Sequence, residues 1–247
     1  MTEFFDRRSR NLRRDADLIY QAAIDYCGVD MDDTTHERIR DKIGIMRDID
    51  TYHDQPGSSI EGSMQLLTDP DSPYFERYPS LFPGQMEQDS YEGFLRLTRD
   101  ILLFGKLASR ATRLDEFIYY RQSEGQLIGD WFAVSATPYV KQQPAFTENL
   151  VPLMESVAIA GNFFDSFFDA PRDYFKGELH VWPGPTFFKR VGTLAIHHAI
   201  PALGIVQYPA VRKELALTAK FRLINKALYN HNGNLRLPLL EGLAPQR

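Results

Sequence analysis

Hydrophobic and polar residues alternate along most of this chain with the period of a helix. Apolar positions recur three or four residues apart from about residue 6 to residue 27, and again from about Thr34 to Asp54. The same period returns over residues 86–107, 113–136, 146–169, 186–207 and 209–230. Alternating β-branched runs are scarce. The pattern predicts an all-α protein that folds as a single domain over residues 1–247.

One segment departs from this pattern. Residues 56–85 contain five prolines and three glycines, together with several Asp and Ser residues. Proline removes a backbone donor and glycine weakens a helix, so both favour turns. We therefore predict a long irregular loop here, of the kind that in a compact domain is either a functional lid or a disordered segment.

Composition narrows the class of protein. A chain of 247 residues that is 43% hydrophobic can bury a substantial core. The net charge of −5 argues against a nucleic-acid binder, which usually carries a basic face. Cys27 is the only cysteine, so an intrachain disulfide and a cysteine-based metal site are excluded. With no signal-peptide pattern and no transmembrane run, we expect a cytoplasmic protein, and a peripheral membrane contact stays open.

The candidate chemistry begins in the segment Asn162–Glu178, where oxygen-bearing side chains recur every three or four residues. A four-residue step along a helix advances about 6 Å and returns to nearly the same face. The side chains that form this row are Asn162, Asp165, Asp169 and Asp173. Phe163 and Phe167 point the opposite way, so the helix is expected to present oxygens on one side and bury aromatic rings on the other.

Two interpretations of the row are open. Hard divalent cations such as Mg²⁺ are held by a few carboxylates together with substrate phosphate oxygens. The alternative is a solvated acidic face, because a chain with 33 acidic residues contains several acidic pairs at this spacing by chance.

A second pair of carboxylates occurs earlier in the chain. Asp50 and Asp54 are four residues apart, and Arg47 lies three residues before Asp50 on nearly the same face. Arg47 is either a helical ion-pair partner of Asp50 or a guanidinium that grips phosphate oxygens. Asp48 is expected to point away from this face, into solvent.

These two stretches resemble a known family. The run from Asp50 to Asp54, Asp-Thr-Tyr-His-Asp, preceded by Arg47, resembles the first aspartate-rich motif of the squalene and phytoene synthases. The second stretch resembles that family's second motif in its aspartates at 165, 169 and 173, followed by Gly177 and then by Trp182-Pro183. It is also similar to the corresponding motif of bacterial terpene cyclases.

The resemblance implies an isoprenoid-synthase-like helical bundle around a central cavity. Asp50 and Asp54 would bind Mg²⁺ from one helix, and Arg47 would hold diphosphate. The opposite helix would supply the remaining metal ligands, Asn162, Asp165, Asp169 and Asp173. Phe168 stands where the family commonly has Arg. Pro171 disfavours a helical conformation at the residue before it, so a kink or a restart is expected there.

Arg121 is a further candidate for a diphosphate contact. It precedes Gly125 and Gly129 in a helical stretch, where glycine costs about 1 kcal/mol relative to alanine. The glycines would allow a kink or a close approach of helices at the pocket. The alternative is ordinary helix packing with a surface Arg–Glu pair.

The sequence thus predicts a Mg²⁺-dependent terpenoid or prenyl synthase that ionises a prenyl diphosphate in an aromatic-lined cavity. Head-to-head condensation of two substrates and cyclisation of one are both open. The alternative is a non-catalytic helical protein that keeps the same fold for binding or assembly.

Overall fold

The computed structural model describes residues 18–53, 58–209 and 211–212. All regular structure in these ranges is helical, apart from one isolated bridge between Pro83 and Met86. The prediction of an all-α protein is therefore confirmed. The helix predicted over residues 209–230 lies almost entirely outside the described residues, as do residues 6–17 of the first predicted helix.

The helices follow one another with short connections. After a helix over residues 18–27 come α2 (Asp33–His53), α3 (Ile60–Thr68), α4 (Pro73–Arg77), α5 (Gln88–Arg110), α6 (Leu114–Ala133), α7 (Pro138–Lys141), α8 (Val151–Lys176) and α9 (Pro185–Ala199). Two 3₁₀ segments, η1 (Pro79–Leu81) and η3 (Pro201–Gln207), and a π-helical turn, η2 (Ala145–Leu150), complete the order.

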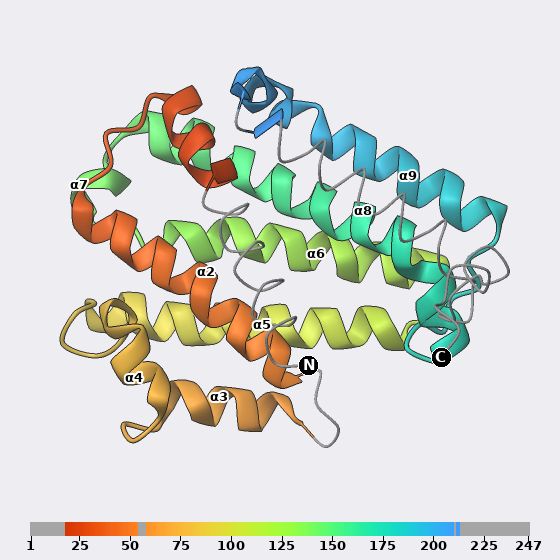
Figure 1. Cartoon of the computed structure of the whole chain (residues 1–247), viewed down its shortest axis with the longest axis horizontal. Helices are drawn as coiled ribbons and strands as arrows, with labels where there is room; N and C mark the ends of the chain where they lie inside the picture. The colour runs from red at the N-terminus through yellow and green to blue at the C-terminus, as the bar shows by residue number, and fades with distance from the viewer. Residues whose placement is uncertain (1–17, 54–57, 210, 213–247) are drawn as a thin grey trace, which may run out of the picture.

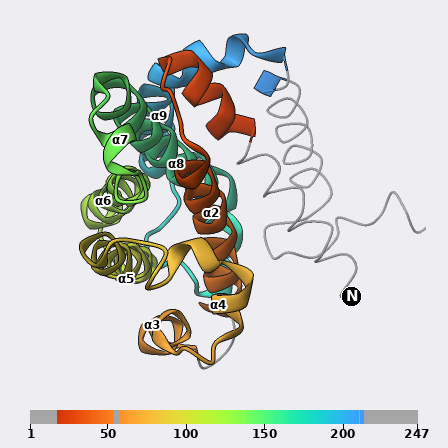
Figure 2. The same cartoon turned by 90° about the vertical axis from the view of Figure 1, so that its left-hand side faces the viewer.

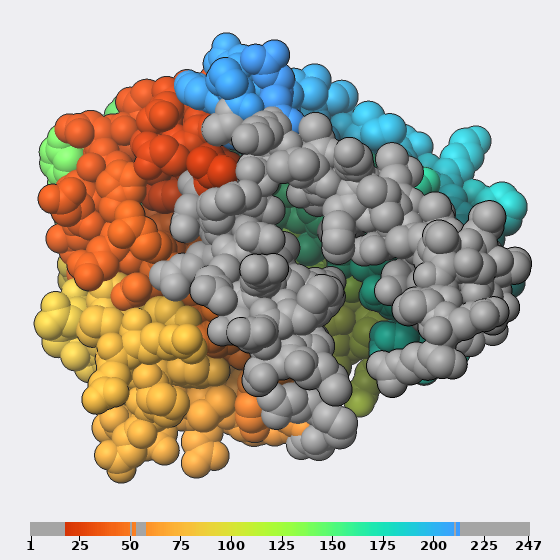
Figure 3. All heavy atoms as spheres, in the orientation of Figure 1, coloured from red at the N-terminus to blue at the C-terminus, as the bar shows by residue number. Residues whose placement is uncertain are grey.

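Four long helices form a layer. Figure 1 shows α5, α6, α8 and α9 side by side, each packed on the next, and α2 crossing α6 and α5 at an angle. The view in Figure 2 places α2 on one face of this layer, with α3 beside α5 at its edge. The face that carries α2 is drawn with all atoms in Figure 3, where α9 and η3 form its upper margin.

The predicted irregular loop is largely helical, which corrects the prediction for residues 56–85. Ser59 and Ser72 accept hydrogen bonds from Gly62 N and Tyr74 N and so cap α3 and α4. Prolines stand in the first turns of α4 and η1, where a missing amide hydrogen removes no helical bond. The helix-breaking residues of this segment therefore mark helix starts.

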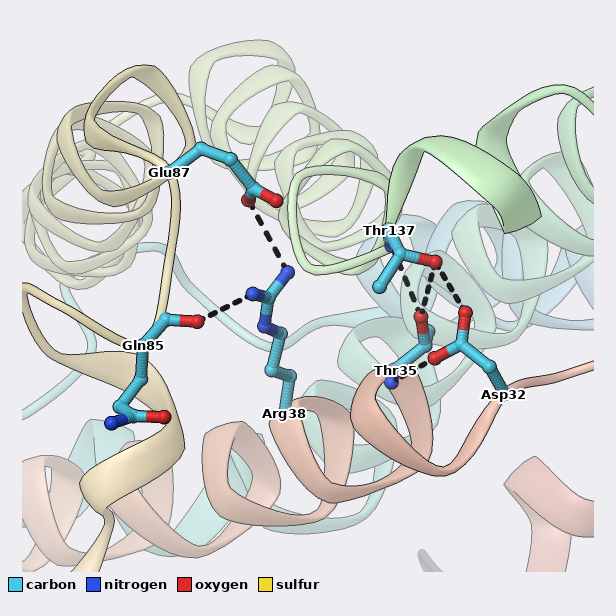
Figure 4. Close-up of polar contacts among 6 residues, drawn as sticks. All are labelled: Asp32, Thr35, Arg38, Gln85, Glu87 and Thr137. Atoms are coloured by element: carbon cyan, nitrogen blue, oxygen red, sulfur yellow. Dashed lines mark hydrogen bonds and ion pairs between the residues drawn. The ribbon is translucent and has the colours of Figure 1, made fainter.

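Polar contacts fix the first turn of α2 to the start of α7 (Figure 4). Asp32 accepts a bond from the backbone N of Thr35 at 2.7 Å, and also one from the hydroxyl of Thr137. The Thr137 backbone N in turn donates to Thr35 Oγ1 at 3.0 Å. Burial opposes ionisation of Asp32, but these hydrogen bonds outweigh it and lower the pKa of its carboxyl. The charged cap thus ties two distant segments together.

Arg38, one turn further along α2, reaches the start of α5. Its Nη2 donates to the carbonyl of Gln85 at 2.5 Å, and its Nη1 pairs with Glu87 at 3.3 Å (Figure 4). The Arg38 side chain is only 5% exposed. Buried guanidinium bonds of this kind hold the N-terminal half of α2 in place, because breaking one leaves a charge without a partner.

Lys42 is fully buried in the same helix. Its Nζ donates to the carbonyl of Trp131 at 2.6 Å and lies about 5 Å from the ring centroids of Phe94 and Trp131. Burial, with smaller contributions from the charges of Lys141 and Arg38, lowers the Lys42 pKa well below its ordinary value. The aromatic faces and the carbonyl provide the favourable contacts that such a buried amine requires.

Two glycines set the separation of α6 and α8. A Cβ added to Gly125 would lie 2.7 Å from Cα and 2.8 Å from N of Ile159, and one at Gly129 would lie 2.9 Å from Cβ of Glu155. The predicted close approach of helices at these glycines is therefore confirmed. The contact joins backbone to backbone, so only glycine fits at Gly125.

The buried apolar side chains form three clusters. The first joins residues 18–27 and the N-terminal half of α2 to the start of α8, and includes Ala23, Ile39, Val140 and Leu150. The second joins the C-terminal half of α2 to α3, η1 and α5, and includes Ile45, Ile49, Leu67 and Phe94. The third joins α6, the C-terminal half of α8 and α9, and includes Phe117, Phe163, Phe187 and Val191.

Candidate metal and diphosphate site

The predicted oxygen row lies on one continuous helix. α8 runs from Val151 to Lys176 without a break at Pro171, so the restart expected there does not occur. The helix ends at Gly177, whose φ of 75° is left-handed, and the following residue closes it with a bond from Glu178 N to Asp173 O of 2.8 Å. Asp165, Asp169 and Asp173 therefore occupy successive turns of α8.

The two sides of α8 differ as the sequence predicts. Phe163 is fully buried in the third cluster, and Phe167 is partly buried with its ring 5.3 Å from that of Phe188. Asp165 is exposed, while Asp169 and Asp173 are partly exposed. The carboxylates thus face solvent and the rings face the core.

Arg172 lies among these carboxylates. Its Nη2 pairs with Asp173 Oδ1 at 2.8 Å and with Asp169 Oδ2 at 3.3 Å, and its Nε also donates to Asp173 at 2.9 Å. The Arg172 side chain is 44% exposed. Ion pairs this exposed contribute about 0–1 kcal/mol, so an incoming charge can displace Arg172 at low cost.

The pKa of the Asp173 carboxyl is raised. Burial raises its pKa above the ordinary value, and the charges of Glu178 and Asp165 raise it further, while Arg172 acts in the opposite direction. Asp165 and Asp173 are therefore close enough to repel one another. A bound cation would relieve this repulsion.

Arg121 approaches the same face from α6. It pairs with Glu124 at 2.8 Å, but the two side chains are only 27% and 14% exposed, so this is not the surface Arg–Glu pair given as the alternative. Burial acts to lower the Arg121 pKa, but Glu124 and the more distant Asp165 and Asp173 outweigh it and raise the pKa. Its backbone carbonyl accepts a bond from Asn162 Nδ2 at 3.3 Å. α6 thus brings one guanidinium to the carboxylate row.

The first motif is only partly described. The backbone of Asp50 lies in α2, but its side chain and all of Asp54 are outside the described residues, so their predicted roles stay predictions. Arg47 Nη2 pairs with Asp48 at 3.1 Å. This contact joins adjacent residues and was not anticipated from the helical spacing.

Asp48 contradicts the prediction of a solvated side chain. It is only 14% exposed and accepts bonds from Arg77 Nη1 and from the hydroxyl of Tyr78, both at 2.7 Å, in addition to the Arg47 pair. Burial raises the pKa of Tyr78, and the bond to Asp48 adds to the rise. Asp48 is therefore the point at which α2 is fixed to α4 and η1.

Sequence reasoning missed two of these residues for different reasons. Arg172 stands three positions after Asp169, a spacing that predicts an ion pair and could have revealed it. The partners of Asp48 lie 29 and 30 residues away in the sequence, so no local pattern marks them.

The donor chemistry of the α8 row fits Mg²⁺, because carboxylate oxygens are the ligands that hard cations prefer. Among the described residues, however, no three Asp, Glu, His or Cys side chains lie close enough together to hold a metal ion. A metal site here therefore requires ligands from outside this set, as the predicted contributions of Asp50 and Asp54 would provide.

Two surface hollows of the structure lie away from α8. One, of about 320 Å³, is lined by Gln21 and by α2 residues from Asp33 to Arg40. The other, of about 570 Å³, lies between α3 and α5. Neither is the central aromatic cavity that the family resemblance implies.

Comparison with known proteins gives no relative. No protein-family model, curated protein or solved structure matches this chain. No helix within the described ranges is both long and apolar enough to span a membrane. What the chain does has to be inferred from its own residues.

Proposed function

We propose that this protein is a Mg²⁺-dependent terpenoid or prenyl synthase with an isoprenoid-synthase-like bundle. The observation that carries the proposal is the row of Asp165, Asp169 and Asp173 on the unbroken helix α8, beside which Asn162 bonds to the backbone of Arg121 in α6. Carboxylates for a cation and arginines for phosphate oxygens are the two groups that binding a diphosphate requires.

In this proposal the acidic residues would bind the metal ion and the arginines would bind the diphosphate. Asp165, Asp169 and Asp173, with Asp50 and Asp54 from α2, would hold Mg²⁺, and Asn162 would orient α6 against the row through its bond to Arg121. Mg²⁺, when bound, would offset the charge that develops on the leaving diphosphate. Arg121 and Arg47 would bind its oxygens.

Arg172 would have a second role in this arrangement. While it pairs with Asp169 and Asp173 it neutralises them, and a cation that takes its place frees the guanidinium for phosphate. This would supply the positive charge that Phe168, one turn after Asp165, cannot. The apolar chain would lie against aromatic faces, which stabilise a carbocation and exclude water. Condensation and cyclisation both use this chemistry.

Release of pyrophosphate from farnesyl or geranylgeranyl diphosphate tests the proposal. With Mg²⁺ present the wild-type chain should release pyrophosphate, and Asp169→Asn should reduce the rate at least a hundredfold. The matched control Asp89→Asn changes an exposed carboxylate on α5 and should leave the rate unchanged. Mass spectrometry of the organic product distinguishes condensation from cyclisation.

A specific observation favours the second candidate, a non-catalytic helical protein for binding or assembly. Arg47, Arg121 and Arg172, the described arginines nearest to the two motifs, are each already engaged in an ion pair within the protein. Structural ion pairs would suffice to explain them. Absence of pyrophosphate release with substrates of every chain length, together with no Mg²⁺-dependent rise in Tm, would establish this alternative.

A further inference from the structure

The outward face of α5 is a straight basic stripe. Solvent-facing positions recur at intervals of three and four, and the side chains there are Arg96, Arg99, Leu103, Lys106 and Arg110. We call these five residues the α5 stripe. From first to last they span about 21 Å of helix. The opposite face of α5 carries the buried residues Phe94, Leu97 and Ile101.

The stripe holds four cations, and one carboxylate, Glu92, stands one turn before Arg96 in the same row. Within the described part of the chain, none of its four cations takes part in an ion pair, whereas nearby Arg113 pairs with Glu116 at 3.8 Å. Two carboxylates, Asp100 and Glu61, border the stripe without pairing to it. The protein as a whole carries a net charge of −5, so this local excess of positive charge runs against its average.

Apolar groups are exposed in and beside the stripe. Leu103 is 40% exposed at its centre, and Tyr119 of α6 is 61% exposed with its ring 6.4 Å from that of Phe104. Leucine and tyrosine at the centre of a cationic surface are unfavourable in water. They become favourable at a lipid interface, where apolar atoms leave water and the phenol stays among headgroups.

A hollow adjoins one end of the stripe. Figures 1 and 2 show α3 running beside α5, and the 570 Å³ hollow lies between these two helices. Ile60, Met64 and Leu95 supply its apolar lining, and its charged lining consists of Arg96, Arg99, Glu61 and Asp100. The arrangement places hydrocarbon and guanidinium side by side, which matches the acyl chain and the phosphate of a lipid.

We propose that the α5 stripe docks this protein on a membrane surface that contains anionic phospholipids. The helix would lie parallel to the membrane, its four cations among the headgroups and Leu103 and Tyr119 at the acyl boundary. A nucleic acid would use the cations but leave the exposed leucine and the apolar hollow without a role. Charge and hydrophobicity together therefore select lipid.

This proposal is independent of the proposed enzymatic activity. The stripe lies on α5, separated from α8 by α6 in the helix layer, and docking requires neither Mg²⁺ nor substrate. A protein without synthase activity could still bind vesicles, and an active synthase could fail to bind them. Membrane docking and synthase activity are therefore tested by separate measurements.

Co-sedimentation with vesicles tests the docking. The full chain should bind phosphatidylcholine vesicles only when phosphatidylglycerol is included, and binding should weaken as salt is raised. Each cation at such a surface contributes about fivefold, so the double change Arg96→Ala/Arg99→Ala should weaken binding by about 25- to 30-fold. Leu103→Ser should weaken it by roughly tenfold even at high salt.

The matched control removes two exposed lysines from the other side of the layer. Lys176→Ala/Lys189→Ala lowers the net charge equally and should leave vesicle binding within twofold of wild type. Equal losses in both double variants, or equal binding to vesicles without phosphatidylglycerol, would overturn the proposal. So would stripe-dependent binding to duplex DNA without any binding to vesicles. Every substituted side chain is solvent-facing, and circular dichroism verifies that each variant is folded.

Discussion

The glycine contact between α6 and α8 predicts that alanine lowers the stability of the protein at Gly125 and raises it at a glycine outside the contact. Alanine at Gly125 would place its Cβ 2.7 Å from Cα of Ile159, about 1 Å closer than an ordinary carbon–carbon contact. The obstacle is backbone, which cannot rotate away as a side chain can. The two helices would have to separate, and overpacking of this kind costs about 1–3 kcal/mol.

Alanine also has a benefit that must be subtracted. In a helix interior it is more favourable than glycine by about 0.5–1 kcal/mol. Subtracting the middle of this range from the middle of the overpacking range, we expect Gly125→Ala to lower the free energy of unfolding by about 1 kcal/mol, and by at most about 2.5 kcal/mol. For a chain of this size each 1 kcal/mol shifts Tm by about 2–4 °C, so the Tm should fall by about 2–4 °C and by no more than about 10 °C.

Gly161 provides the control, because it lies within α8 and a Cβ there would have nothing within 4 Å. Gly161→Ala keeps the helix benefit without the clash and should raise Tm by about 1–4 °C. Thermal and urea unfolding, followed by circular dichroism, measure both variants. If Gly125→Ala proves as stable as wild type, the close approach of α6 and α8 is refuted.

Three further predictions concern charged side chains. The folded state lowers the Lys42 pKa below its ordinary value of 10.5, so at a pH between the folded and the ordinary pKa the unfolded chain binds more protons than the folded chain. The free energy of unfolding should therefore rise as the pH increases toward 10.5. Lys42→Met should remove this pH dependence from the urea midpoints. Asp48→Asn should cost about 2 kcal/mol in urea unfolding, because it weakens three hydrogen bonds made to a charged group. Arg172→Gln should raise the Asp173 pKa further, as seen by carboxyl carbon NMR, since Arg172 is the group that lowers it.

Each of these has a control and a contrary result. Lys189→Met, at an exposed site, should keep the wild-type pH slope, and persistence of the slope in Lys42→Met would contradict the assignment. Asp89→Asn, in the exposed first turn of α5, should lower the free energy of unfolding by less than about 1 kcal/mol, and an equally small effect of Asp48→Asn would show that Asp48 does not fix α2 to α4 and η1. An unchanged or lower Asp173 pKa in Arg172→Gln would exclude the ion pair.

Local features of the fold could be predicted from the sequence, and contacts between distant segments could not. The period of apolar residues located both ends of α2, α5 and α6 within about three positions, because amphipathic helices follow from spacing alone; the helix predicted over 186–207 began correctly but ends at Ala199. α3 was missed because proline and glycine were interpreted as breaks, although serine before a helix and proline in its first turn mark a beginning.

In the candidate site, too, local features could be predicted and long-range contacts could not. The separation of α8 into an acidic and an aromatic side depends on the spacing of its own residues and was predicted. The continuation of α8 through Pro171 was not predicted. A residue before proline disfavours the helical conformation, but Ala170 is buried in the third cluster and stays helical. The burial of Asp48 depends on Arg77 and Tyr78, which chain folding alone brings to it.

The three apolar clusters bear on how the two motifs could act together. The α2 half that carries Asp50 packs in the second cluster, and the α8 half that carries Asp169 packs in the third, and these clusters have no side chain in common. The two motifs thus lie on helix segments that are held by different apolar clusters. A ligand bound by both motifs would hold these two segments together, and it would slow amide hydrogen exchange in α2 and α8 at the same time.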